Sequence, residues 1–284
     1  MFSSTAPLAF TVIISTLDAG ATIARCLASL DGQRGAPPFE VLIQDGKSKD
    51  ATLELCHRSG VVTRVVSEPD HGIYDAWNKA LAHARGDWIL FLGADDQLAA
   101  PDVLARAAAA LASVPGDTLV AYGRVALMNS AGEVLDLVGD PWAQARTRMR
   151  GVMSLPHQGV FHRRTLFERY GSFDSSYRIA GDYALLARAL SDTAPAYVGD
   201  LVVAHMAYGG VSTTPANSLR LLREYRRAQR ERGQRWPGRA WWASAARVRA
   251  RLVLWSVLGE ERARTLLDGG RWAMGRAPVW TRTS

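Results

Sequence analysis

Short apolar runs alternate with helix-like patterns over the first hundred residues of the chain. Four runs have the length and composition of buried strands, at residues 10–15, 39–43, 64–66 and 88–92. The segments between them carry helical signals, namely Ile23, Leu27 and Leu30 at helical spacing, Ser48 as a helix N-cap and an amphipathic stretch over about 73–84. Strands that alternate with helices in this way predict a parallel sheet covered by helices on both faces.

Polar side chains follow each of these four predicted strands. The strands end, in order, in Thr16 and Asp18, in Asp45, in Glu68-Pro-Asp70, and in Asp95-Asp96. In open α/β sheets, ligands bind at the carboxyl ends of the strands. Because all four strands deliver acidic or hydroxyl groups to one edge, the pattern predicts a binding site there.

The pattern changes after residue 100. An Ala-rich helix is expected over about 102–113. It precedes strand-like runs at 118–128, 133–138 and 197–207 and two shorter helices near 164–170 and 181–191. We therefore expect one α/β body over residues 1–216, made of a first half over about residues 1–100 and a second half over residues 101–216.

Charge separates this body from the rest of the chain. The 284 residues are 48% hydrophobic and 21% charged, which is ordinary for a folded globular protein, and they carry a net charge of +7. Residues 217–284 hold 16 arginines against five acidic residues, a net +11, together with six of the nine tryptophans; residues 1–216 therefore carry −4. The chain reads as a mildly acidic body with a basic, Arg/Trp-rich helical extension.

The cellular setting follows from what the sequence lacks. Cys26 and Cys56 fall in helical segments without metal-ligand spacing, which predicts buried thiols in a reducing compartment. The N-terminus has no basic region or full apolar core, so we expect no signal peptide. No run of 18 apolar residues predicts a membrane span. A cytoplasmic protein is expected.

Asp95 and Asp96 are adjacent carboxylates at the end of a buried strand. Such a pair repels itself unless a cation lies beside it. Mg²⁺ and Mn²⁺ accept one or two carboxylates and complete their shells with water and substrate phosphates. The alternative is a pair that caps the helix beginning near Pro101, although residues 97–100 intervene.

Asp45-Gly46 forms the second chemical signal. The carboxylate can accept hydrogen bonds from a base N–H or a ribose hydroxyl, and Gly46 allows the backbone to approach closely. The alternative is an ordinary turn followed by a helix N-cap at Ser48 or Asp50.

Four sequence blocks together resemble the successive motifs of family 2 glycosyltransferases, which are inverting enzymes of the GT-A fold. The blocks are Ile13-Ile-Ser-Thr16, Glu40-Val-Leu-Ile-Gln-Asp-Gly-Lys-Ser-Lys-Asp50, Asp70-His-Gly-Ile-Tyr-Asp-Ala-Trp-Asn-Lys79 and Gly86-Asp-Trp-Ile-Leu-Phe-Leu-Gly-Ala-Asp-Asp96. The resemblance covers roughly residues 8–215 and is strongest to bacterial enzymes that build surface polysaccharides and glycolipids. It implies transfer of a sugar from a nucleotide-sugar donor to an acceptor hydroxyl.

The resemblance also implies roles for the two halves of a catalytic domain over residues 1–216: about residues 1–100 would bind the nucleotide of the donor, and residues 101–216 the acceptor. Thr16, Glu40 and Asp45 would contact the nucleoside. Asp95 and Asp96 would hold Mn²⁺ or Mg²⁺, with Asp96 as the direct ligand and Asp95 nearer the ribose. The chain departs from the family pattern at two places: Leu17-Asp18 stands where Tyr-Asn is usual, and Lys47 precedes Ser48. Both departures concern the choice of nucleotide base.

The block over residues 70–79 would lie across the diphosphate. Asp75, Asn78 and Lys79 fall on one side of the predicted helix, and Lys79 could pair with phosphate oxygens. The alternative is a solvated helix face.

The acceptor side needs a base that removes the proton of the attacking hydroxyl. Asp182 stands where the family places this base, usually in an acidic pair, but Gly181 replaces the first acidic member. The alternative for Asp182 is a helix N-cap. His157 would touch the donor phosphates or the acceptor, against the alternative of a structural histidine, and His205 would belong to a loop that closes over the donor.

The extension shows an apolar helical stripe in which Trp241, Ala245, Val248, Leu252 and Trp255 recur, flanked by Arg249 and Arg251. Arginines beside Trp and Leu suit an anionic lipid interface. The alternatives are a helix packed on the body and, less well supported, nucleic-acid binding without any recognised module. We expect peripheral attachment to the inner face of the cytoplasmic membrane, where a lipid-linked or saccharide acceptor is met; no nucleic-acid partner is expected.

Two other functional classes compete with this interpretation. A sugar nucleotidyltransferase would need a Gly-rich phosphate loop, of which residues 16–21 are a poor version, and the absence of G-x-G-x-x-G after the first strand disfavours a dinucleotide oxidoreductase. A non-catalytic binding relative is disfavoured because Asp95, Asp96 and Asp182 are all present.

Overall fold

The computed structural model of the chain describes residues 7–209, 215–273, 275 and 277–282. Its strands are β1 (Phe10–Thr16), β2 (Phe39–Asp45), β3 (Arg64–Ser67), β4 (Trp88–Gly93), β5 (Gln97–Leu98), β6 (Val120–Met128), β7 (Val134–Val138), β8 (Val160–Arg163) and β9 (Ala196–Ala207). Its α-helices are α1 (Ile23–Asp31), α2 (Thr52–Arg58), α3 (Ile73–Leu81), α4 (Val103–Leu111), α5 (Trp142–Met149), α6 (Arg164–Tyr170), α7 (Gly181–Asp192), α8 (Pro215–Glu231), α9 (Arg239–Leu258) and α10 (Glu260–Ala273). Two 3₁₀ turns, η1 (His157–Gly159) and η3 (Trp280–Arg282), complete the set.

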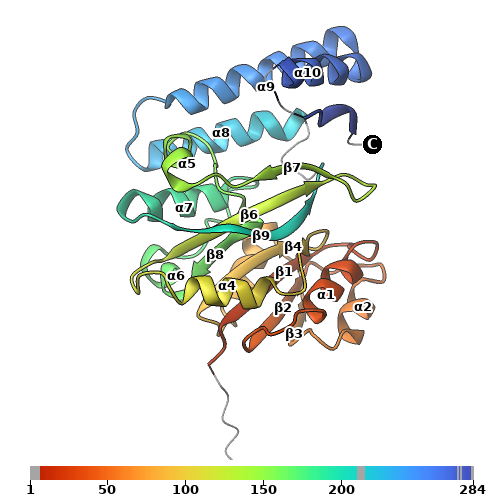
Figure 1. Cartoon of the computed structure of the whole chain (residues 1–284), viewed down its shortest axis with the longest axis vertical. Coiled ribbons are helices and arrows are strands. Elements are labelled where there is room, and N and C mark those ends of the chain that lie inside the picture. Colours follow the sequence, from red (N-terminus) through yellow and green to blue (C-terminus); the bar gives the residue numbers. More distant parts are fainter. Residues whose placement is uncertain (1–6, 210–214, 274, 276, 283–284) are drawn as a thin grey trace, which may run out of the picture.

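One sheet runs through the molecule in the order β3-β2-β1-β4-β8-β6-β9-β5, with β7 paired to β6 (Figure 1). The first four strands in this order are parallel, as the sequence predicts. Beyond β4 the sheet is mixed: β8 is antiparallel to β4 and β6, whereas β9 is parallel to β6. The expected α/β fold is confirmed, with parallel pairing concentrated in the first hundred residues.

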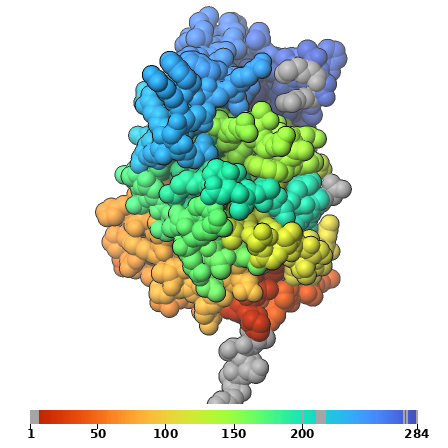
Figure 2. All heavy atoms as spheres, turned by 90° about the vertical axis from the view of Figure 1, so that its left-hand side faces the viewer, coloured from red at the N-terminus to blue at the C-terminus, as the bar shows by residue number. Residues whose placement is uncertain are grey.

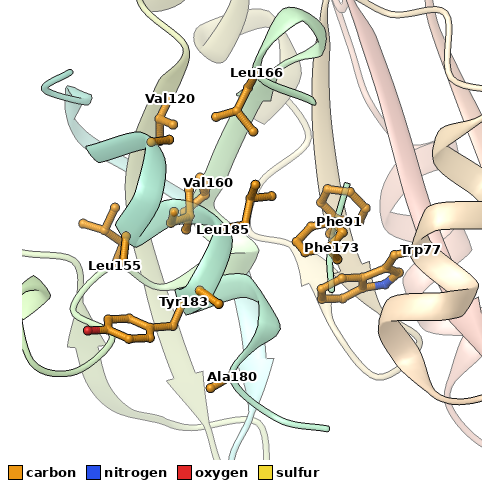
Figure 3. Packing of buried hydrophobic residues seen from close by; sticks show 14 of the residues in the cluster. Trp77, Phe91, Val120, Leu155, Val160, Leu166, Phe173, Ala180, Tyr183 and Leu185 are labelled. Carbon is orange, nitrogen blue, oxygen red and sulfur yellow. The ribbon is translucent and has the colours of Figure 1, made fainter. Parts of the chain in front are cut away.

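Both faces of the sheet are buried, because alternate residues of a strand point to opposite sides. On β4, Trp88, Leu90 and Leu92 pack in one hydrophobic cluster, whereas Ile89 and Phe91 pack in the other. The first cluster lies under α1 and α4 and includes both cysteines, which are buried free thiols as expected. The second lies under α3 and α7, where Trp77, Phe91 and Phe173 meet (Figure 3).

The second helix begins four residues later than expected. It starts at Thr52 rather than near Ser48. Asp50 accepts hydrogen bonds from the backbone N–H of Thr52 and from Gly20 N–H, so it fixes the start of α2 and ties it to the loop after β1. Ser48 accepts from the backbone N–H of Asp18 instead of capping a helix.

The extension is not a separate unit at its start. Tyr225 and Ala228 of α8 belong to the same hydrophobic cluster as α3 and α7. Gln229, which is fully buried, donates to the carbonyl of Gly151. The boundary expected at residue 216 is therefore wrong for the core, because removing α8 would open the cluster that supports α7.

The rest of the extension lies outside α8, at the end of the molecule opposite the N-terminal strands (Figure 1). Helix α9 packs on α8, and α10 packs on α9. Ion pairs from Arg271 to Asp136 and from Arg282 to Glu133 tie the last segment back to the β6–β7 hairpin. No helix within the described residues is both long enough and apolar enough to cross a membrane.

Candidate active site

The carboxyl ends of β1, β2 and β3 converge on the side chain of Asp45. Strand register places Thr16 directly beside Asp45, and Ser67 lies beside it on the other strand. The hydroxyl of Thr16 donates to Oδ1 (2.9 Å) and that of Ser67 to Oδ2 (2.6 Å). The backbone N–H groups of Lys47 and Ser48 also donate to Oδ2, at 3.1 and 3.0 Å, and the Ser48 hydroxyl donates to Oδ1.

Burial alone would raise the pKa of Asp45, but the bonds from Ser48, Ser67 and Thr16 outweigh it and hold the pKa below its ordinary value. Asp45 is therefore an ionised, fully buried carboxylate that organises the turn after β2. The neighbouring Gly46 lies close to Asp70: a Cβ there would lie 2.6 Å from its Oδ2 and would displace that side chain.

The two departures from the family pattern lie opposite each other. Asp18 and Lys47 are the non-glycine residues with positive φ within the described chain, at 48° and 70°. Their loops are joined, since Asp18 Oδ1 accepts from Lys49 N–H at 2.7 Å. Leu17 projects into solvent from the same place. Strained backbone of this kind concentrates at functional sites, and here it shapes the rim of the predicted nucleoside pocket.

The carboxylates of Asp95 and Asp96 both lie close to Gly93, the last residue of β4. A Cβ on Gly93 would lie 2.7 Å from Oδ1 of Asp95 and 2.8 Å from Oδ2 of Asp96, so the two carboxylates approach the same point from different residues. The strand order separates Asp96 from Asp45 by one strand, β1, so both lie on one edge of the sheet.

Burial and, after it, the charge of Asp95 raise the pKa of Asp96 to about 7, against hydrogen bonds from Gly93 N–H, the Gln158 side chain and the backbone of Ala207 that lower it. A buried carboxyl beside a second carboxylate is an environment that a divalent cation relieves. The pair supplies two oxygen-ligand residues, which suits Mg²⁺ or Mn²⁺ completed by water and phosphate. No cluster of three or more metal-ligating side chains occurs in the described part of the chain.

Exposure divides the pair differently from the sequence prediction. Asp96, expected as the direct ligand, is only 1% exposed and is held by Gly93 N–H at 2.7 Å. Asp95, expected nearer the ribose, is exposed. Asp95 is thus the member of the pair that faces solvent, and Asp96 is the buried one.

Asp182 lies in the first turn of α7, beside α3. Its Oδ1 accepts from the hydroxyl of Tyr74 (3.2 Å) and from its neighbour Tyr183 N–H (2.8 Å). Burial raises the pKa of Asp182 to about 6, and the nearby charge of Glu224 raises it as well. Such a carboxyl is ionised at neutral pH and is more basic than an exposed aspartate, which suits a general base.

The replacement of an acidic residue by Gly181 has a steric cause. A Cβ at position 181 would lie 2.8–2.9 Å from three ring carbons of Tyr74. The tyrosine hydroxyl is fixed in turn by a 2.6 Å bond to the carbonyl of Ile179. Tyr74 therefore occupies the space that a second acidic side chain would need.

Three residues that the sequence did not single out complete the acceptor side and the metal side. Glu224 of α8 accepts from the backbone N–H groups of Ile179 and Ala180 (2.9 and 2.8 Å), ahead of α7. Tyr74 positions Asp182, and Gln158 hydrogen-bonds Asp96. No local motif marks them, because each acts across a distance of tens of residues in the sequence.

Asn78 and Lys79, which were expected over the diphosphate, both contact other residues of the chain. Asn78 forms two bonds to the backbone of Phe173, donating to its carbonyl (2.8 Å) and accepting from its N–H (3.0 Å). The amine of Lys79 pairs with Glu68 (3.3 Å) and Asp75 (3.4 Å). Asn78 thus holds the backbone of Phe173, and the charge of Lys79 is shared between two carboxylates. A contact of either side chain with the diphosphate stays a prediction.

Asp75 likewise turns back on the chain, since it accepts from His71 N–H at 3.0 Å and pairs with Lys79. The cation that the structure does bring to this turn is Arg178, which donates to the carbonyl of His71 (2.6 Å) and packs at Gly72. A phosphate contact from this turn would therefore come from Arg178 or the backbone rather than from α3.

Glu40 is placed at the wrong end of its strand for a nucleoside contact. It pairs with Thr11 at the start of β2, five residues before Asp45, or about 16 Å away at the usual rise of a strand. The buried carboxylate accepts from the Thr11 hydroxyl (2.7 Å) and from the guanidinium of Arg85 (2.7 and 2.9 Å). Glu40 therefore stabilises the opposite edge of the sheet.

His157 is a core residue. Its ring stacks on Trp77 (4.9 Å between centroids, 19° between planes) and lies 5.7 Å from Phe91. Burial lowers its pKa to about 3, so it carries no positive charge with which to attract a phosphate. The packing favours the alternative of a structural histidine, and the contact with donor or acceptor stays a prediction.

His205 lies within β9, where it pairs with Gln97, the residue after Asp96. It is half-buried, and burial lowers its pKa. The histidine belongs to the sheet beside the aspartate pair rather than to a loop. The segment expected to close over the donor falls partly on residues 210–214, which lie outside the described residues.

Residues 11–129 match the family described as glycosyl transferase family 2. A PGL/p-HBAD biosynthesis glycosyltransferase of Mycobacterium tuberculosis is 34% identical over 214 residues, covering 72% of this chain and 79% of that protein. The succinoglycan biosynthesis protein ExoO of Rhizobium meliloti is 30% identical over 194 residues, 64% of this chain and 55% of that protein.

Two solved structures share the fold at low identity. S. aureus TarS in complex with UDP-GlcNAc superposes with a TM-score of 0.61 at 19% identity, over 78% of this chain and 66% of that one. The mannosyltransferase PcManGT of Pyrobaculum calidifontis, in complex with GDP-Man and Mn²⁺, superposes with a TM-score of 0.61 at 19% identity, over 98% and 84%. With the identity and coverage of the mycobacterial relative, these likenesses establish that the chain is a glycosyltransferase of family 2 with a GT-A fold.

Proposed function

We propose that the chain is a metal-dependent, inverting glycosyltransferase that moves a sugar from a nucleoside-diphosphate donor to an acceptor hydroxyl. The observation that carries the proposal is Asp182. Its pKa of about 6 is set by burial, and its two hydrogen bonds both end on Oδ1. Oδ2 is then the oxygen available to an incoming hydroxyl.

In the proposed reaction, Oδ2 of Asp182 takes the proton of the acceptor hydroxyl while the acceptor oxygen bonds to the anomeric carbon. The bond between that carbon and the diphosphate oxygen breaks on the opposite side, which inverts the configuration. Tyr74 and Glu224 position the base by fixing the start of α7. The carboxylate of Asp182 is regenerated when the protonated side chain loses its proton to water.

On the donor side we propose that Thr16, Asp45 and the strained Asp18–Lys47 rim hold the nucleoside, with the exposed Leu17 offering an apolar surface to the base. Asp95 would reach Mn²⁺ or Mg²⁺, and Asp96 would support it. The bound cation would supply charge stabilisation to the leaving diphosphate. Structures of two proteins with this fold contain nucleotide sugars, one of them together with Mn²⁺.

We further propose that the acceptor is a lipid-linked saccharide met at the inner face of the cytoplasmic membrane, with the basic extension as the attachment. Support comes from the net +11 of residues 217–284 and from the mycobacterial relative, which is a PGL/p-HBAD biosynthesis glycosyltransferase. Attraction of a basic surface to anionic lipid supplies the physical reason.

Donor-dependent thermal stabilisation tests the proposal. A panel of UDP-, GDP- and TDP-sugars is added to the full chain with and without Mn²⁺, and the melting temperature is followed. At least one donor should raise it, and more so with Mn²⁺, because a ligand that binds only the folded state stabilises it. If no donor produces a metal-dependent rise, the proposed function fails.

A further inference from the structure

Helix α9 is apolar on two different sides. The side expected to meet lipid is the one that packs inward: Ala245 is fully buried, and the indole N–H of Trp241 donates to the carbonyl of Leu222 on α8 (2.9 Å). On the same side, Arg251 donates to Ser218 and lies over the ring of Trp255. The stripe predicted from the sequence is therefore occupied by α8 and the C-terminal turn.

A second apolar stripe faces away from α8. Trp242, Val253 and Val257 are each more than half exposed, and together with Ala246 they recur at intervals of 4, 7 and 4 residues. Such intervals place side chains on one side of a helix. Within the described chain, six of the ten exposed large hydrophobic residues fall between residues 236 and 272. Single exposed apolar residues are ordinary, but a continuous stripe marks an interaction surface.

The charged residues that α9 itself places beside this stripe are all arginines; the acidic residues next along the chain, Glu260 and Glu261, open α10. Arg239, Arg247 and Arg249 are exposed, and none of them forms an ion pair within the described residues. Helix α9 contains no acidic residue. A second copy of the chain would present the same positive charge, so its repulsion disfavours self-association, whereas an anionic surface is complementary.

The position of the helix fits contact with an extended surface. Helices α9 and α10 form the outermost layer at one end of the molecule, beyond α8 (Figure 1). The space-filling view shows the C-terminal segment forming that whole end of the visible face, with the N-terminal strands at the other (Figure 2). A flat partner can therefore touch α9 without contacting the sheet.

We infer that the face of α9 formed by Trp242, Val253 and Val257, flanked by Arg247 and Arg249, is a binding surface for an anionic lipid bilayer, whereas the Trp241–Trp255 stripe holds the helix to the body. The inference deepens the proposed function, on which it rests for the acceptor's location. The apolar side chains enter the headgroup region while the arginines pair with lipid phosphates. No detachment of α9 from α8 is required.

Flotation with vesicles tests this surface on the full chain, in the absence of donor. Vesicles of phosphatidylcholine mixed with phosphatidylglycerol should carry the protein upward, vesicles of phosphatidylcholine alone should not, and added salt should weaken binding. Arg247→Gln with Arg249→Gln should weaken partitioning by about 25-fold, at about fivefold for each arginine. Trp242→Ser with Val253→Ser and Val257→Ser should weaken it at least as much.

Matched variants elsewhere serve as controls. Val134→Ser, on the exposed side of β7, and Arg64→Gln, on the exposed start of β3, should bind vesicles as the wild type does. Equal binding by the triple variant and the wild type would overturn the assignment of the face. Failure of the wild type to bind anionic vesicles, or a dimer in sedimentation that the triple variant loses, would overturn the lipid surface itself. Donor-dependent melting of the same variants reports separately on the catalytic site.

Discussion

At the scale of single residues, burial sets the chemistry of the site. Asp45, Asp96 and Asp182 are all aspartates near one edge of the molecule, yet their pKa values are moved in different directions. Four hydrogen bonds, from Ser48, Ser67 and Thr16, lower the pKa of Asp45, whereas desolvation raises that of Asp96 to about 7 and that of Asp182 to about 6. Carboxyl groups whose environments separate their pKa values in this way have different roles in catalysis.

Asp182→Asn should lower the turnover number by about 10²–10⁴-fold while leaving donor affinity within about twofold, because the amide cannot accept the acceptor's proton. Single-turnover assays and calorimetry with the donor measure the two quantities. In the wild type, activity should rise with pH through about 6 and level off above it, since the base works only when ionised. A loss of donor binding equal to the loss of rate would remove Asp182 from the acceptor side.

Asp96→Asn should stabilise the metal-free protein at neutral pH. Between about pH 4 and 7 the carboxyl is already ionised in the unfolded chain but still protonated in the folded one, so wild-type stability falls over this window. The raised pKa corresponds to about 4 kcal/mol, and the amide's poorer bond to Gly93 N–H offsets part of it, so about 2 kcal/mol is expected at pH 7.

Urea unfolding of Asp96→Asn and wild type at pH 4, 5.5 and 7 measures this difference, with Asp31→Asn at the exposed end of α1 as the control. The advantage of the variant should grow with pH and vanish when Mn²⁺ stabilises the wild type. A constant difference at all three pH values would contradict the assigned pKa.

At the scale of secondary-structure elements, the site depends on contacts between α3 and the loops that precede α7. Tyr74 of α3 fixes the start of α7. One turn further along, Asn78 holds the backbone of Phe173 through both the nitrogen and the oxygen of its side-chain amide. Phe173 in turn packs against Trp77 and Phe91 in the aromatic cluster (Figure 3). Helix α3 thus fixes the position of the segment that leads into α7, where the proposed base Asp182 lies.

Asn78→Ala should destabilise the protein by about 2 kcal/mol, because two backbone groups of Phe173 lose their partners. Asn78→Asp keeps an acceptor for the N–H of Phe173 and should cost less. Chemical denaturation of both variants measures the effect, and donor affinity at low temperature provides the check on function. If Asn78→Ala leaves stability unchanged but weakens donor binding, the residue contacts the diphosphate after all.

At the scale of the whole molecule, the basic extension is joined to the catalytic site. Glu224 of α8 holds the backbone ahead of Asp182, and its charge contributes to the raised pKa of that base. Tyr177 donates to Glu231 of the same helix (2.6 Å). The extension therefore has two parts: α8 packs against the start of α7, where the proposed base lies, and α9 and α10 lie outside α8.

Glu224→Gln should shift the acidic limb of the rate profile to lower pH, because one negative charge near Asp182 is removed. It should also lower stability by about 1 kcal/mol, since the amide accepts more weakly from the backbone N–H groups. Glu231→Gln, on the same helix but bonded to Arg227 and Tyr177, is the matched control and should leave the pH profile in place. Identical profiles for all three proteins would exclude an electrostatic role for Glu224.

The amino-acid sequence by itself determined the parts of this protein that depend on local pattern. Alternating apolar runs predicted the parallel half of the sheet, and the residues after those strands predicted that Thr16, Asp45 and the Asp95–Asp96 pair would share an edge. Both predictions succeed because the spacing of apolar residues in a strand and the residue at which the strand ends are local properties of the sequence.

Only the tertiary structure decided which of those polar groups are available. Glu40 and Asn78 look like site residues in a motif. In the structure Glu40 is hydrogen-bonded to Arg85, and Asn78 to the backbone of Phe173, both from elsewhere in the chain. Likewise α9 carries two apolar stripes, and the packing of α8 determined which one remained exposed. Burial and hydrogen-bond partners are set by contacts between segments distant in sequence, and no local pattern contains them.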